Sequence, residues 1–240
     1  MIDSGKYESY WKNDETWRLE EFQEVIRKCD FDLGFADDNQ DPPSSESEAI
    51  DCIVRGVLRD SNATGKQLNP IAHASTALLA DVCVGVSRRL QPQLLGIPER
   101  CLGSGIRERA ETLRSIRGKL GSMDRYQAIH LLGTGDPLSI LLLTLCGADS
   151  FDGLEWCKTA VDHTTAQLHH FHQYDLFAHQ ADVGDTDIIG YEAAVMSHNL
   201  LFYRSWLHQA HDALAKGKLT DMVRRFLPND VLDNLLNGLR

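Results

Sequence analysis

The amino-acid sequence predicts an α/β fold in which a parallel sheet is followed by a helical C-terminal part. Short apolar runs of strand length alternate with longer segments whose apolar residues recur at helical spacing. Clusters of Gly, Pro, Asn and Asp separate the two kinds of segment. Alternation of this kind is typical of parallel α/β architecture. The expected strands cover residues 1–2, 31–36, 69–74, 94–97, 128–132 and 148–152.

The helices between these strands follow from spacing and from capping residues. Residues 15–29 carry Trp17, Phe22 and Ile26 at helical spacing. Ser45 and Glu48 form a Ser-x-x-Glu capping box that begins a helix extending to about residue 60. Further helices are expected at 76–90, 106–120, 137–146 and from Gly190 to about residue 215. Pro137 suits a first helical turn.

Composition indicates an ordinary globular chain. The 240 residues are 42% hydrophobic and 25% charged, and the formal net charge is −11. No run approaches the roughly 18 apolar residues of a membrane span, and the first residues do not resemble a signal peptide. We therefore expect a cytoplasmic location. The negative charge argues against gripping nucleic acid by bulk attraction, although a local basic strip remains compatible with it.

Cysteine and histidine usage does not predict a metal centre. The six cysteines are scattered and form no Cys-x-x-Cys pair, which is typical of reduced, mostly buried thiols. Several histidines cluster late in the chain, at positions 163, 169, 170, 172 and 179. This cluster fits either a metal site or a solvated helix face.

Acidic residues follow three of the expected strands. These are Asp3, Asp37 and Asp152. In a parallel barrel, catalytic groups lie at the carboxyl ends of the strands. A pair of carboxylates can divide the roles of nucleophile and proton donor in glycosidic chemistry. Each of the three also fits a plain turn or helix-capping residue.

A series of motifs in fixed order resembles the tRNA-guanine transglycosylase family. The segments that carry the resemblance are Asp3-Ser4-Gly5, Phe35-Ala36-Asp37-Asp38, His130 to Pro137 (His-Leu-Leu-Gly-Thr-Gly-Asp-Pro), Gly147 to Asp152 (Gly-Ala-Asp-Ser-Phe-Asp) and Ser197 to Tyr203 (Ser-His-Asn-Leu-Leu-Phe-Tyr). The resemblance implies a (β/α)8 TIM-barrel type of fold that is incomplete, with about six strands, because the family has two strands before Asp-Ser-Gly. It also implies one domain over 1–240, with a barrel core at 1–158 and a helical part at 159–240.

The resemblance also implies an activity, a base exchange in which guanine in nucleic acid is replaced by a 7-deazaguanine. Asp152 takes the nucleophile's position and Asp3 the position of the proton-transferring carboxylate. The residues expected to contact the substrate are Ser4, Gly5, Asp37, His73, Glu99, Arg100 and Gly103. Arginines at 100, 107 and 109 are candidates for phosphate contacts, or for a solvated helix face. The polymer is either tRNA or DNA.

Three departures from the family leave alternatives open. The family's Cys-x-Cys-x-x-Cys is absent, so His198 lacks the thiolates that would complete a zinc site. No cofactor is expected, with zinc as an open alternative. Asn39 stands where the family has a Cys, and Glu99-Arg100 stands where it has a Gly pair. The alternative functions are a non-catalytic accessory subunit or fragment of such an enzyme, with a homodimer or partner subunit, and a barrel hydrolase of unrelated substrate.

Overall fold

The computed structural model describes residues 1–12, 16–184 and 186–237. The chain divides into two compact units. The first comprises Met1–Leu132 with Gly147–Ser150, and the second comprises Gly133–Cys146 with Phe151–Arg240.

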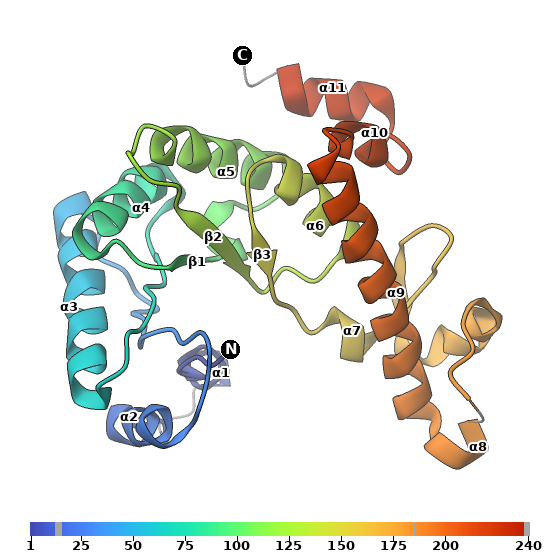
Figure 1. The fold of residues 1–240 in the computed structure, drawn as a ribbon, viewed down its shortest axis with the longest axis horizontal. Coiled ribbons are helices and arrows are strands. Elements are labelled where there is room, and N and C mark those ends of the chain that lie inside the picture. The colour runs from blue at the N-terminus through green and yellow to red at the C-terminus, as the bar shows by residue number, and fades with distance from the viewer. Residues whose placement is uncertain (13–15, 185, 238–240) are drawn as a thin grey trace. The chain divides into compact units, whose positions relative to one another are not determined.

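The first unit consists of helices that alternate with short extended segments (Figure 1). Its helices are α1 (Lys6–Lys12), α2 (Leu19–Lys28), α3 (Glu46–Thr64), α4 (Thr76–Leu90), the 3-10 helix η1 (Glu99–Leu102) and α5 (Ile106–Leu120). Its strands are β1 (Leu94–Pro98) and β2 (Ala128–Leu132), and β3 (Ser150–Phe151) begins in it.

Extended segments pair in parallel and in the order in which they occur along the chain. Single parallel bridges join Ile2 to Gly34, Phe35 to Asn69, and Ile71 to Gly96 in β1. Strand β1 then pairs in parallel with β2, in a register that sets Leu94 opposite Ala128. The sheet order β1-β2-β3 continues the series. Pairing in chain order is the arrangement of a barrel wall, whereas a doubly wound sheet reverses its strand order partway.

Asn69 connects three of these segments through one buried side chain. Its Nδ2 donates to the carbonyl of Gly34 at 3.2 Å, and its Oδ1 accepts from the backbone N–H of Leu94 at 2.9 Å. An amide can do this because it carries both donors and an acceptor. The side chain thereby replaces ladder hydrogen bonds that the short bridges do not supply.

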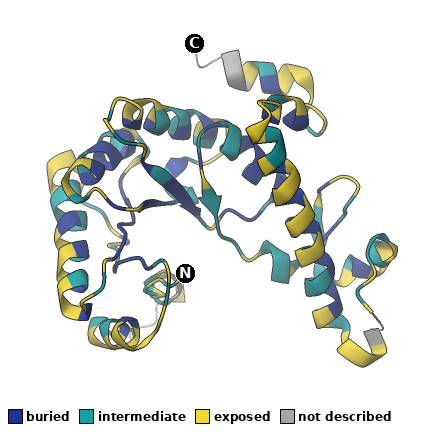
Figure 2. Ribbon diagram, viewed as in Figure 1, coloured by how far each residue is buried: buried dark blue, intermediate teal, exposed yellow. Residues whose placement is uncertain are grey.

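Successive helices form a layer outside the parallel segments. Helix α2 packs on α3, α3 on α4, and α4 on α5 (Figure 1). Ser45 is the N-cap, since its Oγ accepts from the backbone N–H of Glu48, and α3 ends at Gly65 in the left-handed conformation. This is one of the two hydrogen bonds of the predicted capping box. Strand β1 is buried along its whole length, while the outward helix faces are exposed (Figure 2).

The inner side of the parallel segments is filled by the ring of Phe35 and by aliphatic side chains. Phe35 and Ile71 form a buried cluster with Leu94. Gly96 lies against the ring of Phe35, where a Cβ atom would approach to 2.8 Å. A residue without a side chain is therefore needed at this point of β1, because the ring takes the space.

The second unit is mainly helical. Its elements are α6 (Pro137–Leu145), α7 (Glu155–Lys158), strands β4 (Thr159–Val161) and β5 (Leu168–His170), the 3-10 helices η2 (Phe171–Leu176) and η3 (Ala178–Gln180), α8 (Thr186–Ile189), α9 (Tyr191–Ala215), α10 (Leu219–Val223) and α11 (Asn229–Asn237). Phe202 and Trp206 of α9 pack in a cluster with Leu141 and Leu142 of α6. None of the helices in the described ranges is long and apolar enough to cross a membrane.

The structure confirms the α/β class and the parallel sheet, and it corrects finer expectations. The residues described form no closed barrel. Segments 31–36 and 69–74 make single bridges rather than full strands, and Pro70, which has no N–H, interrupts the second one. The helix predicted over 15–29 is Leu19–Lys28, and its predicted start at Glu15 lies outside the described residues. The antiparallel pair β4-β5 and helix α1 were not predicted.

Candidate functional site

The candidate site of the first unit lies where the parallel segments end. The chain turns away from the segments after Ile2, after Ala36, after Ile71 and at Pro98. Because parallel segments end at one edge, the polar side chains that follow them are gathered there. The residues that contact one another at this edge are Ser4, Lys6, Asp37, Asp38, Gln40, His73, Arg100 and Cys101.

Asp37 is the acidic centre of a charge network. Its side chain is 9% exposed, with Nζ of Lys6 3.1 Å from Oδ1 and a guanidinium nitrogen of Arg59 3.1 Å from Oδ2. Arg59 also forks onto Asp60, at 2.7 and 2.9 Å. The backbone N–H of Asp37 donates to Asp60 at 2.9 Å. Two partly exposed cations thus balance two carboxylates, which permits the carboxylates to be buried.

One oxygen of Asp37 accepts no hydrogen bond. Oδ1 is buried and makes no hydrogen bond of good geometry with the described residues, although Nζ of Lys6 lies 3.1 Å from it. The ammonium's hydrogen bond goes to Oδ2 at 3.4 Å. An acceptor held only by this ion pair can accept a further hydrogen bond from a ligand.

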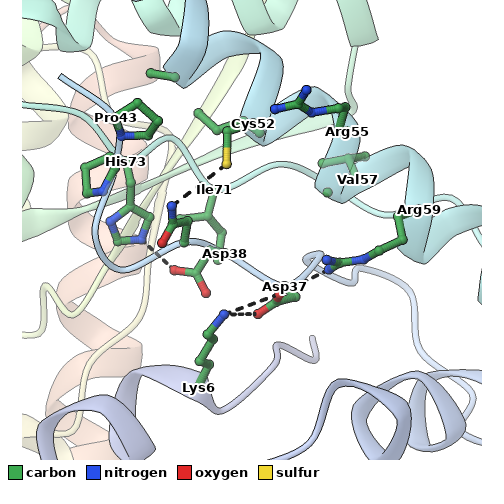
Figure 3. A pocket seen from close by; sticks show the side chains of 15 residues that line it. Lys6, Asp37, Asp38, Pro43, Cys52, Arg55, Val57, Arg59, Ile71 and His73 are labelled. Atoms are coloured by element: carbon green, nitrogen blue, oxygen red, sulfur yellow. Dashed lines mark hydrogen bonds and ion pairs between the residues drawn. The ribbon is translucent and has the colours of Figure 1, made fainter. Parts of the chain in front are cut away.

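Asp37 lines a pocket of about 440 Å³ between its own loop and helix α3 (Figure 3). Lys6, Asp38 and His73 point toward it from one side, and Cys52 and Arg59 of α3 line the other (Figure 3). The volume lies within the range of roughly 300–1,000 Å³ that is usual for small-molecule sites. Pro43 and Ile71 supply apolar surface to the lining.

A second group of contacts joins Asp38, His73 and Cys101. Nε2 of His73 lies 2.5 Å from Oδ2 of Asp38, and its Nδ1 lies 3.8 Å from Sγ of Cys101. Burial alone would lower the pKa of His73, but the hydrogen bonds to Asp38 and Cys101 outweigh it and raise the pKa to about 9. Burial opposes ionisation of Cys101, yet contact with His73 and the charge of Arg100 leave the pKa of its thiol lowered.

The loop after β1 is held by its own ion pairs. Arg100 donates to Gln40 at 2.5 Å and stacks over the ring of Tyr7, 5.1 Å from its centroid. Glu99 and Arg109 form an ion pair at 2.5 Å. Two of the three arginines expected to hold phosphates therefore contact protein groups, and the third, at position 107, is exposed.

Gly103, in the same loop, is held by Arg109, which donates to its carbonyl at 2.9 Å.

The turn that carries Asp3 is exposed. Asp3 accepts from the backbone N–H of Gly5 at 3.1 Å, and Gly5 has a φ of +65°. Oγ of Ser4 lies 3.5 Å from Asp38, so Ser4 is the part of this turn that reaches the acidic pair.

Asp152 belongs to the second unit, where it follows β3. Its Oδ1 accepts from the backbone N–H of Gly133 at 2.6 Å, which orients the carboxylate. Glu155 lies so close to Gly135 and Gly153 that a Cβ atom at either glycine would collide with its carboxylate. Tyr203 of α9 donates to the carbonyl of Gly135 at 2.6 Å. Gly153, in the turn after β3, also lies against the backbone of Gly135, in the turn after β2, so a side chain at Gly153 would be the harder of the two to accommodate.

The histidines of the second unit contact one another and the backbone. Nε2 of His198 donates to the carbonyl of Val161 at 2.8 Å, and its ring lies 4.0 Å from that of His163. Burial lowers the pKa of both. Within the described ranges, no three His, Cys, Asp or Glu side chains are placed to hold a metal ion.

Sequence reasoning singled out Asp37 and His73, and one motif included Asp38, but the pairing of Asp37 with Lys6 and Arg59 was not predicted. Lys6, Arg59 and Asp60 carry no motif, because their role depends on how α1 and α3 pack on the loop. Cys101 could have been found, since it follows the predicted contacts Glu99 and Arg100 directly. No known protein-family model matches this sequence, and no curated protein matches it.

Proposed function

We propose that this chain is a base-exchange glycosyltransferase of the tRNA-guanine transglycosylase type, acting on a (β/α)8-related framework. It replaces guanine in tRNA or DNA by a 7-deazaguanine. The observation that carries the proposal is the buried carboxylate of Asp37 in the pocket, with one oxygen held by the ion pair to Lys6 and by no hydrogen bond of good geometry. Parallel pairing in chain order supports the barrel-related framework.

The chemistry of Asp37 suits a purine of the guanine type. Such a base presents two donors side by side, the N1–H and the 2-amino group, and a carboxylate accepts both. Lys6 and Arg59 neutralise Asp37, so that a neutral base can be bound without leaving a lone buried charge. Adenine presents an acceptor at N1 and is rejected by the same carboxylate.

The proposed reaction consists of two displacements. The carboxylate of Asp152 attacks C1′, an ester bond forms, and the bond from C1′ to N9 of guanine breaks while Asp3 protonates the leaving base. The incoming 7-deazaguanine then attacks C1′ through N9, Asp3 takes its proton, and the ester breaks. Configuration at C1′ is retained, as in retaining glycosidases. The target base has to leave the stack to be reached.

Asp37→Asn tests the base pocket directly. The amide replaces one acceptor oxygen by an NH2 group that faces a donor of the base, so binding of guanine and of a 7-deazaguanine should weaken by about 1.5–3 kcal/mol, roughly 10- to 150-fold. Titration calorimetry measures the affinity. Asp41→Asn is the matched control, because it removes a charge from the same loop at an exposed position outside the pocket lining. Equal affinity in wild type and Asp37→Asn, with equal melting temperatures, contradicts the assignment.

A non-catalytic accessory subunit is the second candidate, and one observation favours it. Helix α9 exposes Leu200, Leu207 and Leu214, which are spaced seven residues apart. Exposed leucines at heptad spacing fit the packing of a partner helix. An accessory subunit would pair with a catalytic chain and form no covalent bond with the polymer. The two candidates are therefore separated by covalent trapping.

A further inference from the structure

We propose that Asp38, His73 and Cys101 form a nucleophilic array. The sulfur of Cys101 attacks the electrophilic carbon of a bound molecule, the bond from that carbon to its leaving group breaks, and the imidazolium of His73 can protonate the departing group. The proposed base exchange uses Asp152 and does not need this thiol. The array is therefore a second reactive centre. A failure of the proposed exchange reaction would not contradict it, and its own failure would not contradict the exchange reaction.

Three consecutive turns of the first unit supply the array. Asp38 follows the second parallel segment, His73 follows the third, and Cys101 lies in η1 directly after β1. Both ring nitrogens of His73 are engaged, one at 2.5 Å from Asp38 and the other at 3.8 Å from the sulfur. A histidine that contacts a carboxylate through one ring nitrogen and a thiol through the other is the recurrent arrangement that activates a cysteine nucleophile.

Burial distinguishes this array from a surface contact. His73 is 3% exposed and the side chain of Asp38 is 9% exposed, so the pair is held in a poorly solvated place. Asp38 also accepts from Gln40 at 2.5 Å, and Ser4 lies 3.5 Å from its other oxygen. The carboxylate is thus fixed on several sides. Cys101 is only partly buried, which leaves the sulfur side of the array the more open one.

The charges around the sulfur favour its ionised form. His73 and Arg100 are the cations that act on Cys101, and the backbone of Ala74 contributes a hydrogen bond. The other thiol that interacts with it is Cys83 of α4, which is fully buried and whose pKa is raised by burial. Asp38 acts through the imidazole rather than on the sulfur. His73 and Asp38 are therefore positioning residues, and Cys101 is the nucleophile.

Site-resolved alkylation tests the array. With iodoacetamide, the sulfur forms a bond to the methylene carbon, the carbon–iodine bond breaks, and iodide leaves. Mass spectrometry then gives the rate at Cys101 relative to exposed Cys29 of the same sample, as a function of pH. His73→Gln keeps a polar side chain but removes the cation. The thiolate fraction should fall about tenfold per unit of pKa while intrinsic nucleophilicity rises about threefold.

At a pH about two units below the ordinary thiol pKa of about 8.5, His73→Gln should lower the ratio of Cys101 to Cys29 alkylation about threefold or more. The midpoint of the Cys101 profile should move to higher pH. Asp38→Asn should change the profile in the same direction. Melting temperatures identify any variant that fails to fold, and for such a variant Arg100→Gln gives a second test of the same shift. An unchanged profile in folded His73→Gln, or a Cys101 that is not alkylated at any pH, overturns the proposal.

Discussion

At the scale of single residues, His73 shows how a buried charge is stabilised by its neighbours. An isolated buried imidazole favours the neutral form, because burial penalises the cation. In this chain the contact with Asp38 reverses that preference and raises the pKa to about 9. The imidazole of His73 binds its proton more tightly in the folded than in the unfolded chain. Protonation of His73 therefore stabilises the folded state.

A pH prediction follows from the direction of this shift. The pKa of His73 in the folded protein lies above the ordinary imidazole value of 6.5, so the stabilisation is complete below about 6.5 and is lost as the pH rises through about 9. We expect the protein with His73 to have a higher melting temperature than His73→Gln. This difference should be largest at the acidic end and should shrink as the pH rises. The comparison is made in a Cys101→Ala background, which removes the coupled thiol. A difference that stays constant or grows with pH contradicts it.

At the scale of elements, the close approach of β1 to the segment carrying Phe35 makes Gly96 a sensitive position. A Cβ at Gly96 would lie 2.8 Å from the ring of Phe35 and 3.2 and 3.3 Å from Leu132 and Ile71. Phe35 is fully buried and cannot move aside easily. Gly96→Ala should therefore destabilise the protein by about 1–3 kcal/mol, measured by urea unfolding.

Gly118→Ala is the matched control for Gly96→Ala. Gly118 lies in α5, is exposed, and has open space where a Cβ would be added. Alanine is the better helix former by about 1 kcal/mol, so this variant should gain stability. Opposite signs for the two substitutions support the packing described, and a neutral or stabilising Gly96→Ala contradicts it.

The order of the elements was predictable, while their lengths and partners were not. Strand and helix signals such as the helix start at Ser45 and the apolar run of β1 are local, and both are confirmed. The short bridges at Phe35 and Ile71 depend on which neighbours complete the hydrogen bonds, as Asn69 does, and no local pattern carries that information. Helix α1 has only seven residues, a length over which apolar spacing does not distinguish a helix from other structure, so its sequence did not identify it.

The candidate site was predictable only in part, because local sequence patterns mark single residues but not the residues that they contact. Asp37 and His73 follow apolar runs, which marks them as residues at segment ends. Lys6 and Arg59 meet Asp37 across 31 and 22 residues of chain, and such pairings are set by tertiary packing. The roles of Asp3 and Asp152 in base exchange remain predictions.

At the scale of the whole molecule, the charge of the chain does not favour binding to the phosphates of a nucleic acid. The chain carries a formal charge of −11, so association with a nucleic acid should be weak and sensitive to salt. Proposed recognition therefore depends on the base in the pocket more than on the phosphates. Arg100 and Arg109 are already paired with Gln40 and Glu99.

Covalent trapping with Asp152→Asn is the measurement that tests the central claim most directly. The wild-type chain is incubated with guanine-containing tRNA or DNA, denatured in detergent, and resolved on a denaturing gel. We predict a detergent-stable adduct with one of the polymers, absent in Asp152→Asn and retained in Asp175→Asn, which removes an exposed carboxylate from the same unit. An adduct that persists in Asp152→Asn, or a folded wild-type chain that traps neither polymer, contradicts the account.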